Sequence, residues 1–236
     1  MLRRVSTLGW VIDLWIAEAL RDERSAVNAL IDMGRLAGLS GRHEEADRFF
    51  DRAAVRARAL GDPVLIGRSN LVLAASSILR DDFTTAEPLL EAAVEMLRNG
   101  EDPKFLIDAL IKLGAVKVKL GQPQDAQEAL DEALAQAKAI GDTDASISAL
   151  YNLGLVAHIA HQNTVAEQYW MAAFQLCSRA RYRTWRAKLA FHLGVVMQDL
   201  GQTRRSREFL EQSRDAYLDL RQPEMARRPT EYLANL

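Results

Sequence analysis

The chain has 236 residues and repeats itself every 40 residues, and no other feature constrains its fold as strongly. In one copy the pattern is Leu153-Gly154, then the small residue Ala166 and the large residue Trp170. Shifted by multiples of 40, one register reads Gly34, Ala74, Gly114, Gly154 and Gly194, and another reads Phe50, Leu90, Leu130, Trp170 and Leu210. A regular period of roughly 20–50 residues indicates an array of structural repeats.

The pattern within one copy describes two helices packed at close range. Leu150, Leu153 and Ala157 are spaced by three and four residues, as are Ala166, Trp170 and Ala173, so each set lies on one helical face. Small residues at the registers of Gly154 and Ala166 let the two backbones approach, while large residues fill the space beside that contact. The sequence therefore predicts a chain of antiparallel helical hairpins.

Turn and capping residues recur with the same period. The turn inside each hairpin is predicted at Gly41, Asp81, Gly121, His161 and Gly201, all residue types that tolerate or are enriched at positive φ. The next hairpin is predicted to begin after an N-cap at Asp22, Asp62, Asp102 and Asp142, with Pro63 and Pro103 in the first turn.

We interpret residues 1–236 as a single domain. It comprises a half-repeat or capping helix at 1–20, five full repeats at 21–60, 61–100, 101–140, 141–180 and 181–220, and a half-repeat helix at 221–236. Two places depart from the pattern. Pro88 predicts a late helix start, with Thr84 or Thr85 as the cap. The joint at 179–183 lacks Gly and Asp, so the helix is expected to run on or to turn differently there.

With its Leu-Gly pair, its turn residue and its later Ala and aromatic positions, the chain resembles the tetratricopeptide repeat (TPR) family. The 40-residue period is longer than the family's usual 34, as in the subclass found in kinesin light chains, bacterial peptide-pheromone receptors and sensor domains of bacterial transcription activators. The resemblance implies an all-α, right-handed solenoid of about twelve antiparallel helices. It also implies a non-enzymatic scaffold that binds a protein or peptide in its concave groove.

The resemblance further implies that first-helix positions beside the Leu-Gly core face this groove. The candidate binding residues are Asn28, Ile31, Arg35, Arg68, Leu71, Asp108, Ile111, Tyr151, Asn152, Leu155, His158, Lys188, Phe191 and His192. The alternative is that long helices pack these residues against one another. Asn152, Lys188 and His192 also lie near the positions of a carboxylate clamp, but Ile111 and Ala115 replace the rest of that set, so no clamp is expected.

Composition excludes several classes of protein. The single cysteine, Cys177, argues against a disulfide framework and indicates a reducing, cytoplasmic location. No long apolar run predicts a membrane span, and scattered basic residues without interleaved aromatics argue against nucleic acid binding. His158, His161 and His192 lack accompanying carboxylates or thiols, so neither a metal site nor a cofactor is expected, and no catalytic motif is present.

Two further functions remain open. Trp10 and Trp15 lie in an apolar stretch at the N-terminus that has no first-helix partner, which predicts self-association and a self-assembling scaffold. Charge is also uneven, with a balance of −7 over 61–180 and +4 over 181–236, which is typical either of solvated helix faces or of head-to-tail association. The other alternative is a ligand-sensing regulatory domain of a bacterial signalling or transcription-regulator system.

Overall fold

The computed structural model describes residue 12 and residues 14–236, and all regular structure in this part of the chain is helical. The chain is an all-α solenoid built from helical hairpins. It divides into two compact units between Leu120 and Gly121, and we describe each unit by itself. Trp10 lies outside the described residues.

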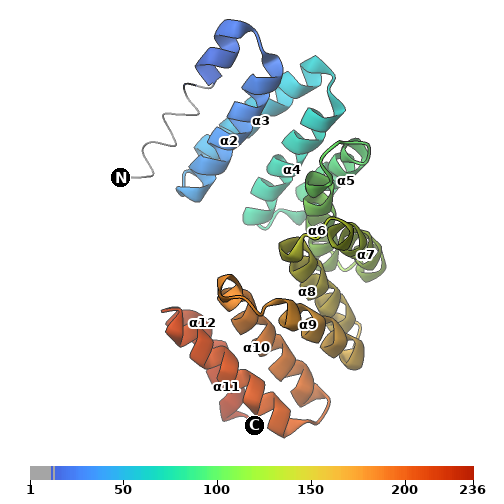
Figure 1. Ribbon diagram of the computed structural model, residues 1–236, viewed down its shortest axis with the longest axis vertical. Coiled ribbons are helices and arrows are strands. Elements are labelled where there is room, and N and C mark those ends of the chain that lie inside the picture. Colours follow the sequence, from blue (N-terminus) through green and yellow to red (C-terminus); the bar gives the residue numbers. More distant parts are fainter. Residues whose placement is uncertain (1–11, 13) are drawn as a thin grey trace. The chain divides into compact units, whose positions relative to one another are not determined.

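The N-terminal unit contains two complete hairpins and a further helix (Figure 1). After a helical stretch at residues 14–20, its helices are α2 (Glu23–Leu39), α3 (His43–Leu60), α4 (Pro63–Leu79), α5 (Phe83–Leu97) and α6 (Pro103–Lys119). Each helix packs against the next, and α4 also contacts both α2 and α6. The first helices of successive hairpins therefore lie side by side and form one face of this unit.

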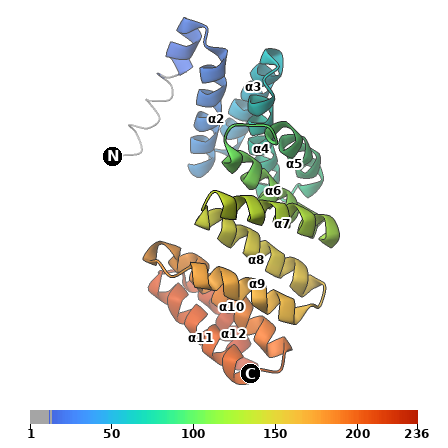
Figure 2. The same cartoon turned by 45° about the vertical axis from the view of Figure 1, so that its right-hand side comes forward.

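The C-terminal unit continues the alternation (Figure 2). Its helices are α7 (Pro123–Ala139), α8 (Thr143–Ile159), α9 (Asn163–Leu176), α10 (Arg183–Asp199), α11 (Thr203–Asp219) and α12 (Pro223–Ala234). A short 3-10 helix, η1 (Ala180–Tyr182), joins α9 to α10. The joint without Gly or Asp thus turns differently from the others, and the side chain of Tyr182 is buried there.

The predicted turns and the four predicted aspartate caps are confirmed. The turn residue of every hairpin has positive φ, including the non-glycine residues Asp81 (57°) and His161 (58°). Each predicted N-cap aspartate accepts hydrogen bonds from backbone N–H groups of the first turn, as Asp62 does from Val64 and Leu65. These contacts satisfy donors that a helix start leaves without partners, and so they fix where each helix begins.

The prediction for Pro88 was wrong. Helix α5 begins at Phe83, with Asp82 as its N-cap, so the proline lies inside the helix rather than in its first turn. Thr85 donates its backbone N–H to the Asp82 carboxylate instead of acting as the cap. Pro88 and Thr84, four residues earlier, are both exposed, so the carbonyl that loses its helical donor can be hydrated.

Glycines make room for the largest core side chains. A Cβ added to Gly154 would lie 2.2 Å from Nε1 of Trp170, and one added to Gly34 would lie 2.3 Å from Phe50. Trp170 is fully buried and donates its indole N–H to the backbone carbonyl of Tyr151 over 3.0 Å. The close approach predicted from the repeat is therefore a direct contact between a glycine and a large side chain.

Candidate functional site

A cavity of about 620 Å³ lies on the face that α2, α4 and α6 form in the N-terminal unit. Five of the predicted groove residues line it, namely Ile31, Arg35, Arg68, Leu71 and Asp108. The rest of its wall includes Gly34, Gly38, Leu39, His43, Ala46, Phe50, Val72, Ala75, Ser76, Leu79, Lys104, Phe105 and Lys112. The first-helix rows predicted from the repeat thus converge on one hollow in this unit.

The floor of this cavity is apolar and continuous with the core. Ile31 and Leu71 are buried, and Ile31 belongs to a core cluster with Val27 and Leu30. At the rim, Leu39 and Leu79 occupy equivalent positions in successive repeats and are 84% and 72% exposed. These two side chains extend the apolar surface of the cavity to its rim.

Arg68 is held in place inside the cavity. Its Nη1 donates a hydrogen bond to Oδ1 of Asn28 over 2.7 Å, and its guanidinium carbon lies 4.3 Å from the centre of the Phe105 ring. Within the described residues, its buried Nε has no hydrogen bond acceptor. Burial lowers the pKa of Arg68, although the guanidinium stays charged at neutral pH because an arginine starts from so high a value.

Two further predicted residues do not line the cavity but belong to its surroundings. Asn28 orients Arg68 through the hydrogen bond just described. Ile111 lies on α6, partly buried and outside the wall. Thirteen wall residues were not among the predicted groove residues, and three of these lie on α6, namely Lys104, Phe105 and Lys112. Two of them follow a signal that was present in the sequence, because Lys104 and Lys112 lie four residues on either side of Asp108 and share its helical face.

In the C-terminal unit the equivalent aromatic residues pack against one another. Tyr151 and Phe191 are only 8% and 7% exposed. The Tyr151 hydroxyl lies 3.0 Å from Nε2 of His192, and its ring meets that of Trp185 edge-on at 5.5 Å. Phe191 meets Tyr232 of α12 in the same way at 5.4 Å. In this unit the predicted row therefore contributes to the core.

The basic side chains of this cluster lie against aromatic rings. The Lys188 ammonium is 3.9 Å from the centre of the Tyr151 ring, and the Arg228 guanidinium is 5.0 Å from that of Phe191. Burial lowers the pKa of Lys188. Burial, reinforced by the positive charges of Lys188 and Arg228, lowers the pKa of His192 to about 3, so its imidazole is neutral at pH 7. Burial also raises the pKa of Tyr151 to about 12, so its hydroxyl remains protonated.

The remaining predicted residues of the C-terminal unit make local contacts. The Asn152 amide donates to the backbone carbonyl of Ser148 over 2.9 Å, and Leu155 is partly buried. Nδ1 of His158 lies 3.1 Å from Oδ1 of Asn163. In residue 12 and residues 14–236, no three His, Cys, Asp or Glu side chains are arranged to hold a metal ion.

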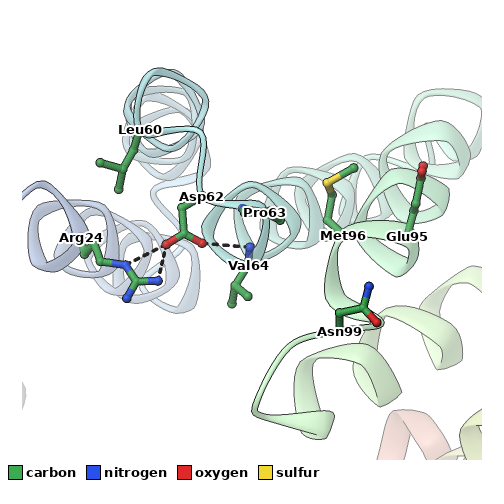
Figure 3. A pocket seen from close by; sticks show the side chains of 8 residues that line it. All are labelled: Arg24, Leu60, Asp62, Pro63, Val64, Glu95, Met96 and Asn99. Carbon is green, nitrogen blue, oxygen red and sulfur yellow. Dashed lines mark hydrogen bonds and ion pairs between the residues drawn. The ribbon is translucent and has the colours of Figure 1, made fainter.

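Two other hollows are not lined by any of the predicted groove residues. The larger, about 810 Å³, lies at the helix ends around Pro63 in the N-terminal unit (Figure 3). There Arg24 and Asp62 point toward each other and form an ion pair, while Glu95, Met96 and Asn99 line the other side of the hollow. The other, about 220 Å³, is bounded by α7, α8 and α9. We favour the cavity at Arg68 as the binding site. In the larger hollow the Asp62 carboxylate already accepts hydrogen bonds from the backbone N–H groups of Val64 and Leu65 and pairs with Arg24.

Two other residues singled out in the sequence are Cys177 and Trp15. Burial raises the pKa of the Cys177 thiol to about 11, which leaves little of the reactive thiolate at neutral pH. No helix in the described part of the chain is both long and apolar enough to span a membrane. Trp15, the described member of the predicted self-association pair, is 69% exposed.

The fold defines a class of architecture, the α-solenoids built from helical-hairpin repeats. Residues 145–219 match the sequence model of the tetratricopeptide repeat family. This part of the chain therefore carries tetratricopeptide repeats, and solved structures of such repeats share its fold. A search of curated proteins found no match.

Three solved structures illustrate the likeness in fold. BtubC (BKLC) from P. vanneervenii has a TM-score of 0.79 at 16% identity, covering 94% of this chain and 93% of its own. Repeats of a putative kinesin light chain from P. anserina reach a TM-score of 0.67 at 19% identity, covering 83% and 96%. YrrB, described as a TPR protein with an unusual peptide-binding site, has a TM-score of 0.58 at 18% identity, covering 91% and 97%.

Proposed function

We propose that this protein is a non-enzymatic scaffold that binds a segment of a partner protein in the cavity lined by Arg68. The observation that supports this most directly is the combination of an apolar floor with the exposed rim residues Leu39 and Leu79. An apolar cavity lined by neighbouring helices suits an extended or helical peptide, whose apolar side chains would be buried in it. The peptide-binding site named for YrrB, which shares the fold, is consistent with this role.

We propose a different role for the matching row of the C-terminal unit. Tyr151, Phe191 and His192 fill their own space, so we assign them to the stability of that unit. Lys188, which is partly exposed at the edge of the cluster, remains a candidate binding residue of the C-terminal unit, as do Asn152 and His158.

The proposal can be tested with a phage-displayed library of random 12-residue peptides. The variant Ala75→Trp places a large ring in the cavity wall, and Ala59→Trp places the same ring on the exposed side of α3 as a control. Peptides selected on the wild-type chain should bind Ala59→Trp equally and Ala75→Trp at least ten-fold more weakly. Equal binding to both variants would locate the site elsewhere.

A second function, the sensing of a small effector as in bacterial regulators, is supported by the size of the cavity. Pockets for small molecules range over roughly 300–1,000 Å³, and about 620 Å³ lies within that range. Screening of a metabolite library by thermal shift, with Ala75→Trp as the negative control, distinguishes the two functions. A metabolite that stabilises only the wild-type chain, together with a failed peptide selection, would favour sensing.

Self-association through the N-terminal helix is a third possibility that we propose for the same scaffold. Ile12, Ile16 and Leu20 follow one another at four-residue intervals, so they form a stripe on one helical face, and all three are exposed beside Trp15. The lone cysteine, Cys177, is buried and reduced, and on that ground we propose a cytoplasmic location.

A further inference from the structure

The cavity at Arg68 contains more positive charge than its own carboxylate neutralises. Its wall includes four basic side chains, namely Arg35, Arg68, Lys104 and Lys112. The single acidic wall residue, Asp108, is already paired with Lys112. Among the described residues, no carboxylate forms an ion pair with Arg35, Arg68 or Lys104. Three cations therefore face the cavity without a contacting counter-charge.

Arg68 illustrates the electrostatic cost of this arrangement. Its guanidinium is partly buried against Phe105, where water compensates the charge less well than at the surface. Asp32 and Asp102 act on it only over a longer range, and neither belongs to the cavity wall. A carboxylate supplied by a ligand would therefore gain more here than at an ordinary exposed arginine.

The positions of the cations indicate what kind of ligand fits. Arg35 comes from α2, Arg68 from α4 and Lys104 from α6, so three neighbouring helices each contribute one charge to the cavity wall. One terminal carboxylate would meet only part of this set, whereas several acidic side chains along a segment would meet all of it. The ligand must also present apolar side chains to Ile31, Leu71 and the exposed rim.

We propose that the cavity binds an internal, acidic segment of a partner protein, in which apolar anchors alternate with Asp or Glu side chains that contact Arg35, Arg68 and Lys104. This inference rests on the proposed function, because it presumes that the cavity binds a peptide. It adds the charge of the ligand and the residues that select it.

The composition of selected peptides tests the two proposals separately. The same phage-displayed library is selected on the wild-type chain at about 50 mM and at 300 mM salt. Enrichment of Asp and Glu beside apolar residues, weakening at high salt, is the expected result, since salt screens charges near the surface. Selected peptides that bind in the cavity but are neutral or basic would overturn the proposal that the ligand is acidic, and would leave the proposed function intact. A library without any cavity-dependent binder would overturn both.

Charge variants provide the matched control. Arg35→Gln with Lys104→Gln removes two exposed cations from the wall, and Arg52→Gln with Arg58→Gln removes two exposed cations from α3, at the same change in net charge. An acidic synthetic peptide from the selection should bind the first variant about 2- to 30-fold more weakly, because each exposed charge pair contributes modestly, and the control unchanged. If both variants bound the peptide equally weakly, the effect would depend on net charge alone, and the proposed contacts with Arg35 and Lys104 would be overturned.

Amidation of the same peptide distinguishes the two sources of carboxylate. An amidated C-terminus should leave its affinity for the wild-type chain within about two-fold, since the proposed contacts are made by side chains. A loss of affinity as large as that caused by the Arg35→Gln, Lys104→Gln variant would mean that the cavity recognises a terminal carboxylate. That result would overturn the proposal that the ligand is an internal segment.

Discussion

Alanine at Gly154 should destabilise the protein even though alanine is the better helix former. In an unconstrained helix the change from Gly to Ala stabilises by about 0.5–1 kcal/mol. Here the new Cβ would lie 2.2 Å from Nε1 and 2.5 Å from Cδ1 of Trp170, a side chain that is fully buried. The ring must shift, and its hydrogen bond to the Tyr151 carbonyl weakens.

The expected magnitude follows from three contributions. Overpacking of a filled core costs about 1–3 kcal/mol, and the disturbed hydrogen bond about 0.5–1.5 kcal/mol more. The gain in helix propensity offsets part of this, so Gly154→Ala should lower the free energy of unfolding by about 1–3 kcal/mol. With a urea slope of about 2 kcal/mol per molar, the midpoint of denaturation followed by circular dichroism should fall by about 1 M.

Gly38 provides the control for this prediction. A Cβ there would meet only the Cβ of Ala46, at 3.9 Å, which is ordinary contact distance. Gly38→Ala should therefore raise the urea midpoint slightly, by the propensity gain of about 0.5 kcal/mol. If Gly154→Ala were as stabilising as Gly38→Ala, the steric reasoning for the hairpin would be refuted.

A double variant tests the same contact from the other side. The second repeat has Ala74 and Leu90, both fully buried, where the fourth has Gly154 and Trp170. Gly154→Ala combined with Trp170→Leu copies this pair and should be at least about 1 kcal/mol more stable than the sum of the single effects. Strict additivity would show that the two positions do not compete for space.

Three other outcomes are expected. Hydrogen bonds from Thr85 lower the pKa of Asp82, so the ionised Asp82 should stabilise the folded protein at pH 7 and lose this effect below about pH 4. In thermal melts over this pH range, the Asp82→Asn variant should not show that loss of stability. Lys117, buried and 3.0 Å from Glu87, should make Glu87→Ala more destabilising than an exposed Glu→Ala change in urea denaturation; equal effects would contradict this. If the exposed stripe mediates self-association, Trp15→Glu should convert dimers to monomers in sedimentation equilibrium, whereas a monomeric parent would exclude that interface.

The repeat made the fold predictable because its signals act locally. Positive φ at Asp81 and His161 could be predicted from their register alone, since the same backbone geometry recurs wherever a helix must reverse. Pro88 was misjudged because the rule against proline within a helix is a preference with a finite cost. The strong aspartate cap at residue 82 and the burial of Leu90 outweigh that cost.

The candidate site was only partly predictable, because a sequence register fixes the direction of a side chain but not the space in front of it. Leu71 and Tyr151 share one register, yet the first lines a cavity and the second lies under Lys188 and Trp185. The difference arises from the size of the neighbours, since the small Ala75 leaves room near Leu71 while large aromatic rings surround Tyr151. Such filling depends on three helices at once and has no periodic signature.

The contact between Gly154 and Trp170 has a consequence for how such a chain can be recombined. Because an alanine does not fit opposite the tryptophan, the first helix of the second repeat, which has Ala74 at this register, could not replace the first helix of the fourth. A transplanted hairpin brings both members of its pair with it and leaves this contact intact. The exchangeable module of this protein, in evolution by duplication as in engineering, is therefore the complete hairpin rather than the single helix.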